Sequence, residues 1–246
     1  MIHIGRATLG DLPRVVLGVD GDSPVVAQAS SEGIDILEVR VDLFGNLSPA
    51  YVVHEVQALK RHALPLIGTI RSRAEGGKAD LSDAQRAHLY SNISPLVDAI
   101  DIDLRAGALK SVIATARSNH NTLILSHHDF RRTSAAADLE RIVRKAAALG
   151  ADIIKVATAA QNERDVVRLL QFTLQHRNKH LVTIALGNDS SLSRLAFPLV
   201  GSLMTYTNVT PTDGQIPAKR LIEDLRFYYP RYNEALINRL GLLECA

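Results

Sequence analysis

Short apolar runs alternate with longer amphipathic segments along most of this chain. The runs are rich in β-branched residues and have the length of strands, whereas the longer segments repeat apolar residues every three or four positions, as in Leu139, Val143 and Ala146. The pattern predicts strands at residues 15–19, 36–41, 66–71, 99–104, 122–126, 152–156, 181–185 and 199–205.

Eight strands with a helix after each predict a (β/α)8 TIM barrel with parallel strands, formed by residues 1–246 as a single domain. The length of 246 residues is close to the usual size of this fold. An open doubly wound sheet is the alternative. It would usually carry a glycine-rich phosphate turn after its first strand, and the segment at residues 18–21 is too short for that turn.

Smaller features mark the ends of elements. Ser82 with Gln85 three residues later fits a capping box at the start of a helix, and Gly150 fits a helix stop. Residues 1–5 predict an extra strand below the barrel, and the residues after Tyr229 predict a helical tail.

The amino-acid composition indicates which partners and which cellular location to expect. Apolar residues make up 46% of the chain and aromatic residues only 4%, so the core must be aliphatic, as buried parallel strands require. The 28 basic and 26 acidic residues are evenly spread, which argues against a nucleic-acid partner. No apolar run is long enough to predict a membrane span. The single cysteine, Cys245, has no intramolecular partner, so we expect a cytoplasmic protein.

Unusual polar residues stand at the carboxyl ends of the predicted strands, the end at which barrels of this kind hold their active sites. Glu38, Arg40 and Asp42 share one face of their strand because side chains alternate. Buried charges require pairing, and a structural ion pair is the alternative interpretation.

The next two strands show the same pattern. Arg71 shares a face with Thr69 and precedes Glu75-Gly76-Gly77, although a salt-bridged surface loop would also fit that segment. Asp101 and Asp103 share a face of the fourth strand.

Two adjacent histidines follow the fifth strand. His127 and His128 point in opposite directions in an extended segment, so they would not bind one metal ion together. We expect no metal here and favour a histidine that acts as general acid and base.

Lys155 interrupts an otherwise apolar strand. Lysine is rarely buried without a reason. It could reach the rim, or pair with Asp152 or a carboxylate of a neighbouring strand. The functional interpretation is a neutral amine that attacks a carbonyl group, favoured by burial and by cations that converge on the barrel mouth. The candidate cations are Arg40, Arg71 and Arg194.

Arg194 lies in the seventh loop and Gln215 in the eighth. A guanidinium group and an amide at the same barrel end suit a carboxylate ligand.

These residues form six motifs whose order resembles that of type I 3-dehydroquinate dehydratase, the Schiff-base class of this shikimate-pathway enzyme. The resemblance covers residues from about 14 to about 228. The motifs are Glu38-x-Arg40-x-Asp42, Thr69-x-Arg71 followed by Glu75-Gly76-Gly77, Ser126-x-His128-Asp129-Phe130, Ala151-Asp152-x-x-Lys155, Ser193-Arg194 and Gly214-Gln215. The third motif selects His128 over His127.

The resemblance implies dehydration of 3-dehydroquinate to 3-dehydroshikimate by a homodimer, without metal or cofactor. Lys155 would form a Schiff base with the substrate ketone, His128 would act as general base and then general acid, and Glu75 would orient His128. The substrate-binding residues that it implies are Glu38, Arg40 and Arg71 for the ring hydroxyls, and Arg194 and Gln215 for the carboxylate.

The chain departs from the family pattern in two places. Asp103 stands where the family usually has glutamate. In the eighth loop Pro211 replaces a serine and Asp213 is added near the ligand, so we expect Thr210 or Thr212 to supply the lost hydroxyl.

Two other functions remain open at this point. A class I aldolase also uses a barrel lysine, but most aldolases need a glycine-rich phosphate site in the last loops, where Gly187 and Gly214 stand alone. The other is a non-catalytic barrel that binds a metabolite.

Overall fold

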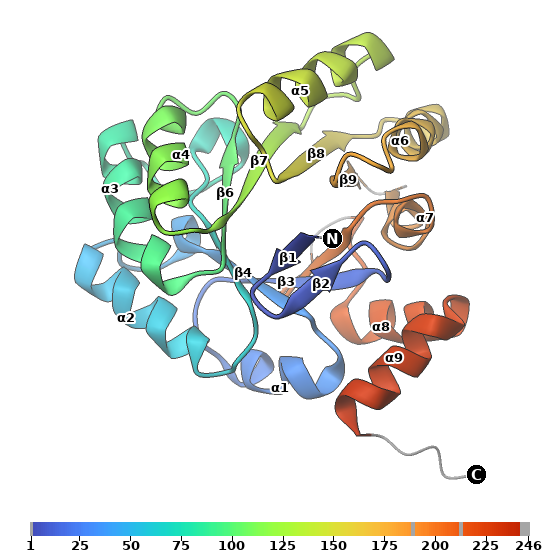
Figure 1. Ribbon diagram of the computed structural model, residues 1–246, viewed down its shortest axis with the longest axis horizontal. Coiled ribbons are helices and arrows are strands. Elements are labelled where there is room, and N and C mark those ends of the chain that lie inside the picture. Colours follow the sequence, from blue (N-terminus) through green and yellow to red (C-terminus); the bar gives the residue numbers. More distant parts are fainter. Residues whose placement is uncertain (1, 188–189, 212–213, 242–246) are drawn as a thin grey trace.

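The computed structural model describes residues 2–187, 190–211 and 214–241, and eight parallel strands form its inner wall. Figure 1 shows the helices arranged around these strands. The strands are β3 (Arg14–Val19), β4 (Ile36–Arg40), β5 (Leu66–Thr69), β6 (Ala99–Asp103), β7 (Thr122–Asp129), β8 (Ile153–Ala159), β9 (Leu181–Leu186) and β10 (Met204–Asn208). From β3 to β9 each strand pairs in parallel with the next along the chain, and β10 pairs in parallel with β3. The predicted (β/α)8 barrel is therefore confirmed.

The barrel is nearly closed between β9 and β10. Along this seam the backbone N–H of Leu203 donates to the carbonyl oxygen of Leu181 at 2.9 Å. The N–H of Thr183 donates to the Ser202 hydroxyl at 3.1 Å, so a side chain takes the place of a backbone acceptor.

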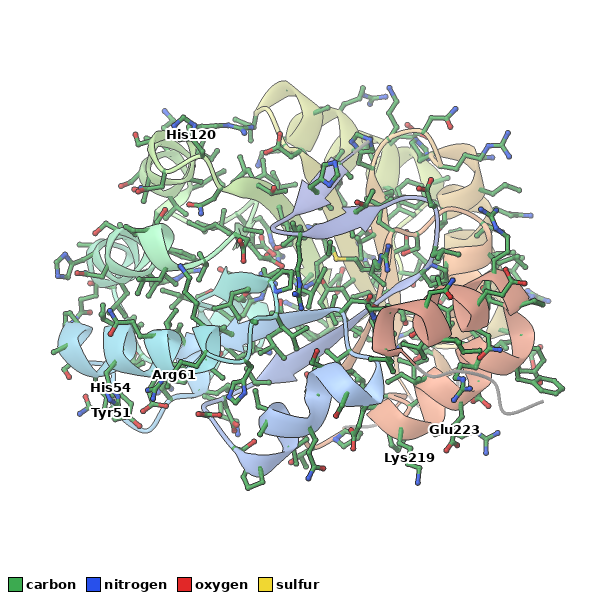
Figure 2. All side chains as sticks on the ribbon, turned by 60° about the horizontal axis from the view of Figure 1, so that its bottom comes forward. Tyr51, His54, Arg61, His120, Lys219 and Glu223 are labelled. Atoms are coloured by element: carbon green, nitrogen blue, oxygen red, sulfur yellow. The ribbon has the colours of Figure 1, made fainter. Side chains whose placement is uncertain are left out.

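Helices cover the outside of the barrel. They are α1 (Pro24–Glu32), α2 (Pro49–Lys60), α3 (Asp83–Ile93), α4 (Leu109–Ser118), α5 (Ala136–Ala148), α6 (Glu163–Gln175), α7 (Ser193–Leu199), α8 (Ala218–Tyr228) and α9 (Pro230–Leu240), with 3-10 turns at Val41–Leu43, Arg73–Glu75 and Ser94–Leu96. Tyr51 and His54 on α2, and Lys219 and Glu223 on α8, point away from the barrel (Figure 2). None of the described helices combines the length and apolarity needed to cross a membrane.

Side-chain alternation in the strands divides the core into two parts. One hydrophobic cluster lies between the strands and the helices, and the other lies inside the barrel. In β4, Leu37 and Val39 belong to the first cluster and Ile36 belongs to the second. Glu38, two residues after Ile36, therefore faces the barrel interior, which the sequence had left open. In β8, Ile153 and Ala157 belong to the interior cluster, and Lys155 lies between them on the same face.

A short hairpin lies across the amino-terminal end of the barrel (Figure 1). It consists of β1 (Ile2–Ile4), which the sequence predicted, and the antiparallel β2 (Ala7–Leu9). Ile4 and Leu9 are buried in the barrel interior. The hairpin closes the end opposite to the predicted site, since Arg14, the first residue of β3, donates to the carbonyl oxygen of Thr8 at 2.8 Å.

The helical tail is α9. Tyr232 and Leu236 bury its apolar face. Arg239 pairs with the buried Asp35 and donates to the carbonyl oxygen of Gly33 at 2.9 Å. The tail therefore packs against the loop that precedes β4.

The predicted bounds of the last strand were wrong. Residues 199–203 are not strand: Leu199 ends α7 and is 75% exposed, and β10 begins only at Met204. Residues 200–203 connect α7 to β10, and Leu203 is buried in the barrel interior without being part of a strand. The helix ends were predicted correctly, since Ser82 and Gln85 form a capping box and Gly150 adopts φ +80° after α5.

Candidate active site

One cavity of about 470 Å³ opens at the carboxyl ends of the barrel strands. This volume is in the range of small-molecule binding sites. All eight residues predicted as catalytic or substrate-binding line it: Glu38, Arg40, Arg71, Glu75, His128, Lys155, Arg194 and Gln215. The barrel thus brings together side chains from six strand–helix units that lie far apart in the sequence, with Arg194 placed on α7.

Lys155 lies inside the barrel with 3% of its surface exposed, so it does not reach the rim. Its Nζ donates to Asp101 Oδ2 at 3.0 Å and to Glu38 Oε1 at 3.1 Å. These carboxylates come from β6 and β4 across the barrel. Asp152 is not a partner, because it pairs with Arg117 at the other end of the strand.

The charges nearest to Lys155 are carboxylates. The sequence left open a pairing of the lysine with a carboxylate and named Arg40, Arg71 and Arg194 as candidate cations at the barrel mouth. In the structure two carboxylates contact the amine, and Arg71 binds those same carboxylates. The reason is burial: an interior ammonium group and guanidinium group each require counter-charges. The structure therefore describes the ion-paired state of the lysine.

Asp101 joins this cluster to β7. Arg71 donates to its Oδ2 at 2.7 Å, and the Ser126 hydroxyl donates to its Oδ1 at 2.6 Å. Burial by itself would raise the pKa of the Asp101 carboxyl, but Arg71 and Lys155 outweigh burial and hold this pKa well below its usual range. Asp101 is thus a permanent negative charge beside the lysine.

Tyr206 forms another wall around the amine. Lys155 Nζ lies 4.1 Å from the centroid of its ring, which is a cation–π contact. Burial raises the pKa of Tyr206 well above its usual value, so the phenol stays neutral. A cationic nitrogen at this position is therefore stabilised by carboxylates and by an aromatic face.

His128 lies near the end of β7, buried and beside the lysine cavity. Its Nδ1 is 3.2 Å from Asp103 Oδ2. Burial first, and then the positive charge of Arg71, lower the pKa of His128 to about 4, against the opposing hydrogen bond with Asp103. The imidazole is therefore neutral at pH 7 and available as a proton acceptor. Within the described residues, no group of three or more His, Cys, Asp or Glu side chains is arranged to hold a metal ion.

Glu75 does not have the contact that was expected of it. Its carboxylate accepts hydrogen bonds from the Ser72 hydroxyl at 2.7 Å and from Arg86 at 3.1 Å. In the described structure, it is Asp103 that contacts the His128 ring. The buried Arg86 requires a counter-charge, and this need holds Glu75 beside α3.

Arg194, on α7, provides a further positive charge in the lining of the cavity. It is 3% exposed, and burial lowers its pKa to about 10, so it stays protonated at neutral pH. Its Nε has no hydrogen-bond partner among the described residues, and within them we find no ion pair to this guanidinium. Arg40, by contrast, is paired with Asp42 at 2.9 Å. A buried cation of this kind suits an incoming carboxylate.

Gln215 is held at the cavity edge by Asn208, the last residue of β10. The Asn208 side-chain amide donates to Gln215 Oε1 at 3.1 Å, which orients the glutamine carboxamide. Asn208 lies beside Gly18 in the β10–β3 ladder. A Cβ atom at Gly18 would lie 2.1 Å from Asn208 Oδ1, so only glycine leaves room for this arrangement.

The profile of the family described as type I 3-dehydroquinase matches residues 19–231. The chain belongs to this family. It is 34% identical over 235 residues to the 3-dehydroquinate dehydratase of Methanosarcina barkeri, an alignment that covers 92% of this chain and 97% of the relative. It is 32% identical to the 3-dehydroquinate dehydratase of Salmonella typhimurium, covering 87% of this chain and 90% of that one.

Solved structures of the type I 3-dehydroquinase family agree in fold. A type I 3-dehydroquinate dehydratase from Clostridium difficile, with covalently modified comenic acid, superposes with a TM-score of 0.85 at 28% identity and covers 94% of this chain and 98% of that one. The 3-dehydroquinate dehydratase from Aquifex aeolicus gives a TM-score of 0.78 at 31% identity, with 89% and 99% covered.

Three residues at the site were not among the predicted site residues: Tyr206 and Asn208, which line the cavity, and the buried Asp101, which contacts Lys155. Asp101 was noticed in sequence only as one of two carboxylates on a strand face. Tyr206 and Asn208 were missed because the last strand was predicted to end at residue 205, just before both. Correct strand bounds would have identified them, because alternation places Tyr206 and Asn208 on one face. Thr210 lines the cavity, whereas Thr212 and Asp213 lie outside the described residues.

The pKa of His128 sets an expected pH dependence. The histidine can accept a proton only when neutral, so activity is retained above its pKa of about 4 and lost as pH falls through that value. We expect kcat/KM to show its acid limb near pH 4, with the substrate's own titration measured separately. An acid limb near the usual histidine value of 6.5 would contradict this environment.

Gly18→Ala is expected to weaken substrate binding without harming the chemical step. The added methyl group displaces Asn208 and so releases Gln215. We expect KM to rise about 5-fold, as loss of about 1 kcal/mol of hydrogen bonding implies, with kcat little changed. Gly45→Ala is the matched control, because a Cβ atom at Gly45 meets nothing within 4 Å. Steady-state kinetics of both variants test this, and equal KM values would contradict it.

Proposed function

We propose that this chain is a 3-dehydroquinate dehydratase that forms an imine between Lys155 and the substrate ketone. The observation that carries the proposal is the buried Lys155 in a cavity that is also lined by a neutral His128 and by an Arg194 without an ion-pair partner among the described residues. Membership in the type I 3-dehydroquinase family and the names of its relatives support it.

The first step makes the imine. Lys155 transfers a proton to Glu38, whose Oε1 lies 3.1 Å from Nζ, and the neutral amine adds to the C3 carbonyl carbon of the substrate to give a carbinolamine. Glu38 returns the proton to the carbinolamine hydroxyl, which leaves as water, and the product is a protonated imine. Glu38 and Asp101 remain beside the nitrogen, so the two carboxylates that pair with the ammonium group in the free protein also stabilise the iminium charge.

The second step eliminates water. The iminium withdraws electrons and makes the C2 hydrogen acidic, and His128 removes it as a general base to give an enamine. The enamine electrons then expel the C1 hydroxyl group, to which the protonated His128 returns the proton. Hydrolysis of the new iminium by one water releases 3-dehydroshikimate and restores the lysine amine, so one water molecule is lost overall.

Binding of the substrate uses the charges at the cavity rim. We assign the substrate carboxylate to Arg194 and the carboxamide of Gln215, which Asn208 orients. We assign the ring hydroxyls to Arg40 and to Arg71, with Glu38 shared between a hydroxyl and the lysine. Among these, Arg194 has the largest expected contribution, because a carboxylate would pair a buried cation.

Borohydride trapping tests the proposal. The protein is incubated with 3-dehydroquinate and borohydride, digested, and mapped by mass spectrometry. We expect reduced adduct at Lys155 and, without borohydride, release of a conjugated enone. Lys78 is an internal control, because it also lines the cavity but is exposed. Adduct at Lys78 alone, or none, would overturn the proposal; adduct only with sugar phosphates would indicate an aldolase.

Assembly and location are proposed on narrower grounds. We infer a homodimer from the family resemblance, and light scattering in solution tests it directly. We infer a cytoplasmic location from the single cysteine, and no nucleic-acid partner from the even spread of charge. Cell fractionation and a DNA-binding assay at low salt test these two inferences.

A further inference from the structure

The carboxylate of Asp103, the last residue of β6, contacts His128 at two points. Its side chain is fully buried. Oδ2 accepts a hydrogen bond from the backbone N–H of His128 at 3.1 Å and lies 3.2 Å from His128 Nδ1. One carboxylate thus contacts both the backbone and the ring of the histidine.

Arg105 binds the Asp103 carboxylate and holds it in place. Its Nε donates to Asp103 Oδ1 at 3.0 Å and its Nη2 donates to Oδ2 at 3.2 Å, which is a two-point contact of guanidinium with carboxylate. The same guanidinium donates to the carbonyl oxygen of His128 at 2.6 Å. The histidine backbone is therefore held on both its N–H and its C=O side.

The carboxylate also determines which ring nitrogen carries the proton. Burial would raise the pKa of Asp103, but the hydrogen bonds from His128 and Arg105 outweigh burial and hold it well below its usual range. An ionised carboxylate only accepts hydrogen bonds, so Nδ1 of the neutral imidazole must be the protonated nitrogen. Nε2 is then left with the lone pair that a general base needs.

Glu75 is held elsewhere. Its carboxylate is bound by Arg86 and Ser72, and moving it toward the histidine would leave the buried Arg86 without its closest counter-charge. The register of the sheet favours Asp103 instead, since Asp103 pairs with Ser126 and so lies beside the strand segment that carries His128.

We propose that Asp103, supported by Arg105, is the positioning residue for His128 in this protein. The proposal rests on the proposed function for its catalytic consequence. It gives a role to the aspartate that stands where relatives of this family usually have glutamate. A shorter acid is sufficient here because Arg105 holds it against the histidine.

Asp103→Asn is the central test, because it keeps the size of the side chain and removes the charge. We expect kcat to fall by about 10²-fold or more, as loss of the correct tautomer does in other histidine dyads, with KM changed only a few-fold. Borohydride should still trap substrate on Lys155. Asp103→Glu should restore a large part of kcat.

The ¹⁵N chemical shifts of the His128 ring report which ring nitrogen carries the proton. If Asp103 had only a structural role, its replacement would leave these shifts unchanged. In the unmutated protein we expect protonation on Nδ1, with the resonance assigned by its loss in His128→Gln. Asp103→Asn should shift the population toward Nε2 protonation. Glu75→Gln is the matched control and should leave the tautomer unchanged.

Arg105→Met keeps the proposal testable if Asp103→Asn does not fold. Half of the Arg105 side chain is exposed, so its loss disturbs the core less. We expect an intermediate, several-fold loss of kcat and a partial change in tautomer. An unchanged tautomer and kcat in Asp103→Asn and Arg105→Met, or a tautomer that responds to Glu75→Gln instead, would overturn the proposal. Failure of the proposed function would appear differently, as an unmutated protein that neither traps nor turns over 3-dehydroquinate.

Discussion

Lys155→Met is expected to reduce turnover of 3-dehydroquinate to about one ten-thousandth or less, because the other amine that lines the cavity in the described structure, that of Lys78, is exposed. Borohydride should trap no substrate on the variant. Initial rates of enone formation, combined with peptide mapping, measure both effects. Methionine retains most of the length of lysine but forms no imine.

The same substitution should lower stability. It leaves Glu38 and Asp101 with Arg71 as their only close cation among the described residues, and breaking a buried ion pair costs about 3–5 kcal/mol. A thermal melt detects this loss and shows whether the variant is folded at the assay temperature. Lys60→Met is the control, because Lys60 is exposed at the end of α2 and should change neither property. Turnover near the normal rate in a folded Lys155→Met protein would refute the imine mechanism.

His128→Gln should separate imine formation from elimination. The lysine, its carboxylates and the binding arginines remain, so the substrate still condenses with Lys155 and is trapped by borohydride. Proton transfer at C2 loses its base, and we expect kcat to fall by about 10²–10⁴-fold. Single-turnover measurements distinguish adduct formation from product release.

His127→Gln is a close control for that variant. His127 is the adjacent residue on β7, but it does not line the cavity and its side chain alternates to the other face of the strand. We expect kcat within a few-fold of normal. A larger loss for His127→Gln than for His128→Gln would mean that the two histidines have been assigned the wrong roles.

The barrel and the sets of residues that share a strand face could be predicted from the sequence. Alternation along 36–41 placed Glu38 and Arg40 together, and the interruption of an apolar strand by Lys155 made this lysine the candidate reactive centre. These are local properties, since the face on which a side chain lies depends only on its position within a strand. The prediction failed at the last strand, which begins at Met204 and ends at Asn208, so Tyr206 and Asn208 were missed.

The sequence by itself therefore determined the barrel, the family and the set of side chains at one barrel end. Only the tertiary structure decided which of these side chains are partners. Lys155 and Glu38 are 117 positions apart, and closure of the barrel brings them to 3.1 Å. Likewise, Glu75 was the expected partner of His128, but Arg86 holds Glu75 and Asp103 takes its place. The physical reason is that each buried charge must find a counter-charge within hydrogen-bond distance, and those distances are set by packing between strands.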